Sequence, residues 1–172
     1  MLTKEFNKEV LYTAEDLTKV SKADIQALKQ KALGNERKRI RLCSHKDVND
    51  SLHEMLIVHM RDAYVRPHKH INKCESVHII EGSLDIVIFD EDGKVTEVTP
   101  LGDYASGRNF YHRMETALYH TFLFHSDFVV FHEITKGPFN RSDTIFSPWS
   151  PPESDPKAWE AYIEDLRNTS AH

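Results

Sequence analysis

The chain has 172 residues, the length of one ordinary domain, and needs neither a metal ion nor a disulfide to fold. Its 22 Lys and Arg against 27 Asp and Glu give a net charge of −5, without a basic block that could neutralise nucleic-acid phosphates. No apolar run approaches the roughly 20 residues that cross a bilayer, nothing near the N-terminus resembles a signal peptide, and Cys43 and Cys74 lie far apart. We therefore expect a soluble, cytoplasmic protein that binds neither nucleic acid nor a membrane.

An N-terminal extension spans residues 1–36 and contains one predicted helix. Ser21 and Asp24 have the spacing of a capping box, and apolar residues then recur at helical intervals until Gly34, a residue typical of helix ends. We expect a helix over about 22–33. Its predicted buried stripe consists of Ile25, Leu28, Ala32 and Leu33.

Short apolar runs separated by turn residues fill the central region, residues 37–150. The runs cover residues 55–59, 77–80, 84–89, 95–98, 121–124 and 128–134. Asp92 with Gly93, and Ser126 with Asp127, each lie between two runs and predict hairpins. Short, frequent strands without helical patterns between them favour an antiparallel sandwich or barrel over a parallel sheet.

The C-terminal tail, residues 151–172, follows a proline-rich crossing and predicts a second helix in the same domain. Asp155 is the expected N-cap and Pro156 the first helical residue. The apolar stripe, which we expect to pack on the outside of the barrel, consists of Trp159, Tyr162, Ile163 and Leu166.

The most informative motif is H-x-H-x4-E-x6-G, formed by His68, His70, Glu75 and Gly82. Side chains two residues apart leave the same face of a strand, so both imidazoles point one way, and a hairpin can return Glu75 to that face. In the second strand, alternation places Val77 inward with Glu75. These residues predict a metal site, and their spacing resembles the first signature of the cupin superfamily.

The same alternation, continued upstream from His68, predicts that Arg66 and Tyr64 also face the interior. Arg66 would then offer a fork of donors to a carboxylate or phosphate, or bridge to a carboxylate at the barrel rim. Tyr64 is either a proton donor or a packing residue. We name Arg66 and Tyr64 as the candidate catalytic residues.

A fourth metal ligand is expected from elsewhere in the chain. The candidates are His112, His120, His125 and His132. We favour His120 because it opens the strand that runs into the last predicted hairpin, where the second cupin motif places its histidine; His112 is the alternative. The remaining strand histidines, which we interpret as packed or surface residues, include His53, His59 and His78.

Further segments extend the resemblance over roughly residues 37–152. Together with the metal motif, residues 39–45, 64–70, 89–93, 119–120, 132–139 and 146–151 are similar to the WbuC-type cupin metalloproteins. This resemblance implies an all-β cupin fold, a double-stranded β-helix or jelly-roll barrel, with flanking N- and C-terminal helices. It also implies His68, His70, Glu75 and His120 as metal ligands and an association with surface-polysaccharide biosynthesis.

Three imidazoles and one carboxylate suit a divalent ion such as Fe, Mn, Ni, Co or Zn, and a six-coordinate ion would keep two positions open. A barrel of about eight strands has room inside for one small ligand, so we expect a small anionic or sugar-like molecule. One hypothesis is a metal-dependent isomerase, epimerase, lyase or oxygenase. The other is a non-catalytic module that binds or senses a small molecule through the metal.

The oligomeric state is predicted from the N-terminal segment. Residues 5–12 could form an edge strand, and cupins often pair through such edges. We expect a homodimer.

Overall fold

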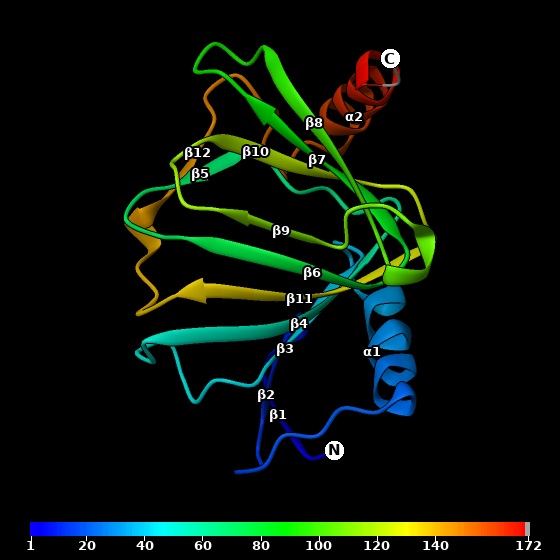
Figure 1. Ribbon diagram of the computed structural model, residues 1–172, viewed down its shortest axis with the longest axis vertical. Coiled ribbons are helices and arrows are strands. Elements are labelled where there is room, and N and C mark those ends of the chain that lie inside the picture. Colours follow the sequence, from blue (N-terminus) through cyan, green and yellow to red (C-terminus); the bar gives the residue numbers. More distant parts are fainter. Residues whose placement is uncertain (171–172) are drawn as a thin grey trace.

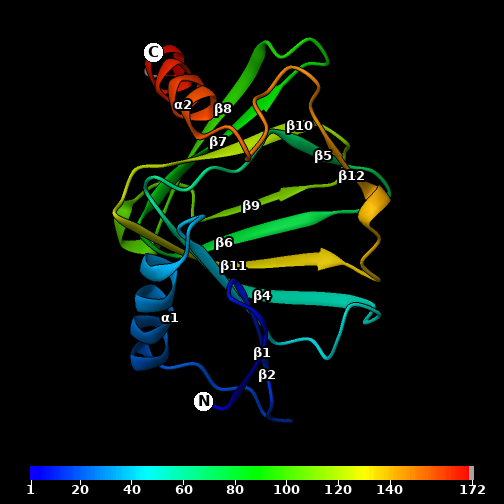
Figure 2. The ribbon, with the colours of Figure 1, turned by 180° about the vertical axis from the view of Figure 1, so that it is seen from behind.

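Two β-sheets face each other in the computed structural model, which describes residues 1–170, and a helix covers the outside of each sheet (Figure 1; Figure 2). The first sheet contains, in spatial order, β1 (Thr3–Asn7), β2 (Val10–Thr13), β3 (Arg39–Cys43), β4 (Leu52–Met60), β11 (Phe128–Lys136), β6 (Glu75–Glu81) and β9 (Tyr111–Met114). The second contains β12 (Thr144–Phe146), β5 (His68–His70), β10 (Tyr119–Phe124), β7 (Ser83–Phe89) and β8 (Val95–Gly102). The predicted all-β jelly roll with flanking helices is confirmed.

The main core lies between the two sheets. Alternation along β6 places Val77 inside as predicted, at 2% exposure, and Ile79 with it at 1%, while His78 and Ile80 face outward. Across the interior these residues belong to one apolar cluster with residues of β10 and β11, including Phe124 and Phe131. This cluster fills one part of the barrel interior, and the inward-facing polar groups line the cavity in the remaining part.

Helix α1 (Lys22–Gly34) begins with the predicted capping box, in which the Ser21 hydroxyl and the Asp24 carboxylate each accept a backbone hydrogen bond. Leu28 and Ala32 pack against the outer face of β3, β4 and β11. The prediction for Leu33 is wrong: it is 47% exposed, and Lys29 is buried instead with its ammonium paired to Glu81. The helix also runs through Gly34, because Asn35 provides its C-cap.

Helix α2 (Pro156–Ser170) packs on the outer face of the second sheet. The Asp155 carboxylate accepts a hydrogen bond from the Ala158 backbone at 3.1 Å, as expected of an N-cap. Leu166 is buried against β7 and β10, which confirms the predicted exterior packing. Residues 171–172 of the predicted tail lie outside the described residues. Neither described helix is long and apolar enough to span a membrane.

The two predicted hairpins have different outcomes. Asp92 and Gly93 turn β7 into β8, and Gly93 has a φ of 89°, which a residue with a side chain rarely adopts. The hairpin at Ser126 and Asp127 is wrong, because β10 pairs with β5 and β7 whereas β11 pairs with β4 and β6. This turn transfers the chain from one sheet to the other.

Two short helical turns and the N-terminal hairpin complete the fold. The 3-10 turns η1 (Tyr104–Ser106) and η2 (Arg141–Asp143) precede β9 and β12. The N-terminal extension joins the first sheet, because β2 pairs in parallel with β3 and β1 pairs with β2 at the sheet edge. The extension therefore continues the layer that forms one wall of the interior.

Candidate metal centre

The motif residues meet where the two sheets approach each other. His68 and His70 lie on β5 in the second sheet, and His120 on β10 is the register partner of His68. Glu75 begins β6 in the first sheet. The predicted hairpin between the two motif strands is therefore wrong, since the segment 71–74 crosses between sheets, but the crossing still returns Glu75 to the same interior.

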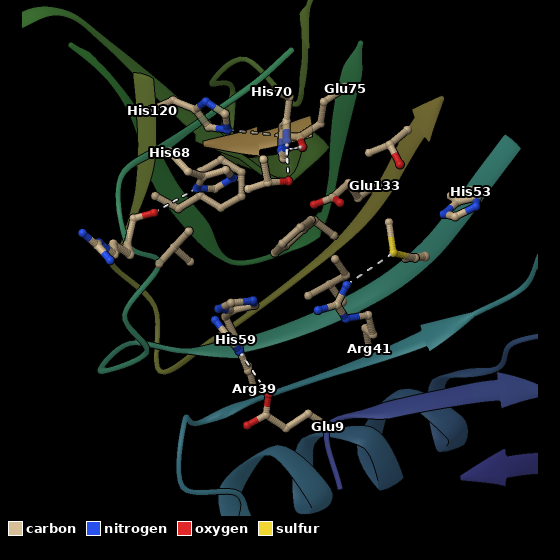
Figure 3. A pocket seen from close by; sticks show the side chains of 18 of the residues that line it. Glu9, Arg39, Arg41, His53, His59, His68, His70, Glu75, His120 and Glu133 are labelled. Atoms are coloured by element: carbon tan, nitrogen blue, oxygen red, sulfur yellow. Dashed lines mark hydrogen bonds and ion pairs between the residues drawn. The ribbon is translucent and has the colours of Figure 1, made fainter. Parts of the chain in front are cut away.

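Three imidazoles and one carboxylate converge at this place (Figure 3). One ring nitrogen from each of His68, His70 and His120 lies within 4.8 Å of the others. The Glu75 carboxylate oxygens are 3.3 Å from His70 Nε2 and 3.7 Å from His120 Nε2. His112 lies on β9 beside Val77 and is outside this group. The structure therefore gathers His120, rather than His112, with the motif residues.

Hydrogen bonds fix how the three rings are presented. Nδ1 of His68 lies 2.8 Å from the Arg66 carbonyl oxygen, and Nδ1 of His120 lies 3.0 Å from the Leu118 carbonyl oxygen. Nδ1 of His70 lies 3.1 Å from the Thr144 hydroxyl. Because a backbone carbonyl can only accept, His68 and His120 carry their proton on Nδ1 and keep an Nε2 lone pair for a ligand. Such outer contacts are typical of histidines that bind a metal ion.

The electrostatics favour the protonation states that a cation requires. Burial, with the neighbouring imidazoles, lowers the pKa of His68 to about 3, and burial also lowers the pKa of His120. Burial alone would raise the pKa of Glu75, but the hydrogen bond with His70 and the surrounding imidazoles lower it to about 2. Neutral imidazoles around an ionised carboxylate form a borderline donor set that fits a divalent transition metal.

A cavity of about 340 Å³ extends from these four residues through the barrel. It lies within the size range of small-molecule sites. Its wall on the first sheet includes Arg41, His59 and Glu133, which the sequence analysis did not propose as site residues. In the same lining, Arg37 and Arg39 pair with Glu9 and Glu153.

The two candidate catalytic residues lie in different surroundings. Arg66 lines the cavity, but its guanidinium donates to the Ser147 carbonyl at 2.8 Å and lies over the Phe146 ring. Tyr64 lies outside the cavity lining, stacks on Trp159 and donates its hydroxyl to the Pro151 carbonyl at 2.9 Å. Strand β5 begins at His68, so the two-residue alternation does not extend upstream to Tyr64.

Glu133 is the least expected residue of the cavity. It lies on β11 between Met55 of β4 and Val77 of β6, and forms no hydrogen bond or ion pair among residues 1–170. Burial, followed by repulsion from Glu75, raises the pKa of Glu133 to about 8. Alternation from Phe131 could have shown that the Glu133 side chain faces the interior. However, α1 covers part of the outer face of β11, so apolar residues occur on both faces of this strand and the sequence does not show which face is inside.

Comparisons with known proteins support the fold but do not identify a function. The family model of a domain of unknown function, DUF6016, matches residues 20–101, and no curated protein matches the chain. The Shewanella oneidensis protein SO0799 has a similar solved structure, with a TM-score of 0.50 and 15% identity over 72% of this chain and 77% of that one. CapF, solved with the inhibitor 3-isopropenyl-tropolone, has a TM-score of 0.50 and 14% identity over 65% of this chain and 32% of that one.

Oxalate decarboxylase from Bacillus subtilis, described with Mn(II) centres, has a TM-score of 0.45 and 18% identity over 56% of this chain. The match covers 24% of that enzyme, so the chain corresponds to a fraction of its length. The strand order and the structural neighbours together define this chain as a protein of cupin fold.

Proposed function

We propose that this protein is a metal-dependent cupin that acts on a small anionic or sugar-like molecule. His68, His70, Glu75 and His120 would hold one divalent ion of Fe, Mn, Ni, Co or Zn. The observation that carries the proposal is the convergence of three imidazoles and a carboxylate on the wall of a cavity of about 340 Å³. A bound ion there would polarise an oxygen of the ligand or of water.

The charge of the cavity supports an anionic ligand. Basic side chains outnumber acidic ones in the lining, and two of the acids, Glu9 and Glu153, are neutralised by arginines. Lys73 and Arg141 lie over aromatic rings and form no ion pair among residues 1–170. An anion that enters the cavity would therefore meet a positive potential.

The biological setting follows from the sequence resemblance to WbuC-type cupins. We propose a role in surface-polysaccharide biosynthesis in the cytoplasm, with an isomerase, epimerase, lyase or oxygenase reaction. A homodimer would pair through strand β1, whose residues are all exposed at the edge of the first sheet. The alternative function is a module that binds or senses its ligand through the metal without turnover.

Metal content of the purified protein tests the ligand set. We expect one ion per chain in the wild type, and loss of the ion with an unchanged circular dichroism spectrum in His68→Ala and Glu75→Ala, because the apolar core folds without the ion. His120→Ala should lose the ion and its matched control His112→Ala should keep it. Wild-type metal content in His68→Ala and Glu75→Ala would refute the assignment.

Turnover separates the enzyme from the binding module. The metal-loaded protein would be assayed for oxygen uptake and for conversion of sugar nucleotides with each candidate ion. Activity that disappears in Glu75→Ala supports the enzyme. Ligand binding without any turnover across the series of ions supports the binding module.

A further inference from the structure

The cavity wall on the first sheet presents three polar side chains that the metal centre does not use. Arg41 lies on β3, His59 on β4 and Glu133 on β11, and all three line the cavity. The strand registers place Arg41 beside Ile57 and Phe131, one row from Glu133, while Glu133 lies one row from Glu75. Figure 3 accordingly shows Glu133 between the metal-binding group and Arg41.

Among the cavity arginines within residues 1–170, Arg41 and Arg141 have no acidic or carbonyl partner for the guanidinium. Arg141 lies over the Phe146 ring, whereas Arg41 is exposed at the end of the wall that carries Glu133. The Arg41 guanidinium approaches the Met55 sulfur at 4.0 Å, and this sulfur is a weak acceptor. By contrast, Arg39 is paired with carboxylates and Arg66 is bound to the Ser147 carbonyl. The planar fork of Arg41 therefore keeps its donors available for a carboxylate or a phosphate.

His59 provides a second and independent observation. The side chain is 6% exposed and stacks on Phe124 with the ring centroids 4.7 Å apart. Its Nδ1 has no hydrogen-bond partner among the residues that the structure describes. Burial, together with Arg39 and Arg41, lowers the pKa of His59 well below its usual value, so the ring is neutral. Buried polar atoms are nearly always paired in native proteins. Because the His59 ring lines the cavity, a ligand bound there could provide the missing hydrogen-bond partner.

Glu133 completes this wall with a carboxyl group that has no hydrogen-bond or ion-pair partner within the described part of the chain. The carboxyl group lines the cavity, where it can form hydrogen bonds with the hydroxyl groups of a ligand. The rows of Glu75, Glu133 and Arg41 follow one another along the strands at intervals of about 7 Å. The two intervals separate the backbones of Glu75 and Arg41 by about 14 Å, so the long Arg41 side chain would have to cover part of this distance to reach a sugar acid or a sugar phosphate bound at the metal-binding group.

We propose that Arg41, His59 and Glu133 form a recognition subsite for the carboxylate or phosphate group of a hydroxylated small molecule. Arg41 binds the anionic group, His59 and Glu133 bind adjacent oxygens, and the opposite end of the molecule reaches the metal-binding group. This inference rests on the proposed function for the metal end of the ligand, but the subsite itself consists of residues that are not metal ligands.

Calorimetric titration of the Zn²⁺-loaded and Mn²⁺-loaded protein tests the subsite with three probes: D-gluconate, glucose 6-phosphate and neutral sorbitol. We expect at least one of the two anions to bind at least tenfold more tightly than sorbitol, and the stronger of the two identifies the anionic group. Arg41→Gln should remove this preference while metal content stays at the wild-type value. Arg66→Gln, the matched cavity arginine, should change the anion affinity less than threefold.

His59→Phe supplies a variant that keeps the packing on Phe124 and removes the ring nitrogens. It should fold with an unchanged or higher melting temperature and lose affinity for the anion at least threefold. Equal binding of sorbitol and both anions, or loss of the preference in Arg66→Gln instead of Arg41→Gln, would overturn the subsite. If the wild type binds no metal, the proposed function fails; an anion preference that persists in the metal-free protein and depends on Arg41 would still support the subsite.

Discussion

Glu133→Gln should stabilise the metal-free protein, and the gain should grow as the pH rises. The carboxyl group of Glu133 lies among Met55 and Val77 with no hydrogen-bond or ion-pair partner among residues 1–170. Burial and the neighbouring Glu75 raise its pKa from 4.5 to about 8. The folded chain therefore holds a proton that the unfolded chain releases between these two values.

The sign and the size follow from this difference. Below pH 4.5 the group is protonated in both states and glutamine should be nearly neutral. Between pH 4.5 and about 8 each pH unit costs the wild type about 1.4 kcal/mol relative to glutamine, which gives a ceiling of about 5 kcal/mol. The carboxyl group borders the cavity, where polarisable surroundings reduce the free-energy penalty of ionising it. We therefore expect Glu133→Gln to raise the free energy of unfolding by about 2–3 kcal/mol at pH 8.

Urea unfolding of both proteins at several pH values from 5 to 9, with a chelator present, measures the gain. The difference between the two proteins removes the contributions of the histidines, since both chains contain them. Glu97→Gln, at an exposed position on β8, serves as a control for replacing a carboxyl group by an amide. A difference between Glu133→Gln and wild type that stays constant across this pH range would refute the reasoning, because it would mean that Glu133 titrates normally.

Three further substitutions test the packing around the site, each by urea unfolding. Gly82→Ala should destabilise by about 2–4 kcal/mol, because φ is 84° and the new Cβ would lie 2.5 Å from the Phe128 carbonyl oxygen; an effect below about 0.5 kcal/mol would contradict this. Leu166→Ala should cost about 2–4 kcal/mol by opening a cavity under α2, and a negligible loss would show that the helix is not anchored there. Glu81→Gln should cost about 1–2 kcal/mol by weakening the ion pair of the buried Lys29, and should leave metal content unchanged.

The grouping of the candidate metal ligands could be predicted because their placement depends on local geometry. His68 and His70 are two residues apart on one strand, and alternation along β6 fixed the directions of Glu75 and Val77. These expectations needed no knowledge of which strands pair. The choice of His120 depended on the resemblance to cupins, and the structure places it in register with His68 across two neighbouring strands.

Sheet membership could not be predicted in the same way. The turn at Ser126 and Asp127 has an apolar run on each side. A hairpin and a crossing between two sheets both produce this pattern, so the sequence does not distinguish them. Strand β11 pairs with β4, about seventy residues earlier in the chain, so its partner is determined by the closure of the whole barrel rather than by the turn. The same reason explains why the segment between His70 and Glu75 is a crossing rather than a hairpin.

The three residues of the proposed recognition subsite show the limit of local patterns most clearly. Arg41, His59 and Glu133 come from three strands, and they share one wall only because the registers of β3 with β4 and of β4 with β11 align their rows. None of the three has a distinctive sequence spacing. Taken by itself, His59 has the sequence pattern of a packed core residue. In the proposed site, the candidate metal ligands are specified by one short segment and one strand, whereas the residues proposed to select the ligand are specified by strand pairing. Related chains could then keep the metal motif and change their ligand through substitutions at such cross-strand positions, without any change in spacing.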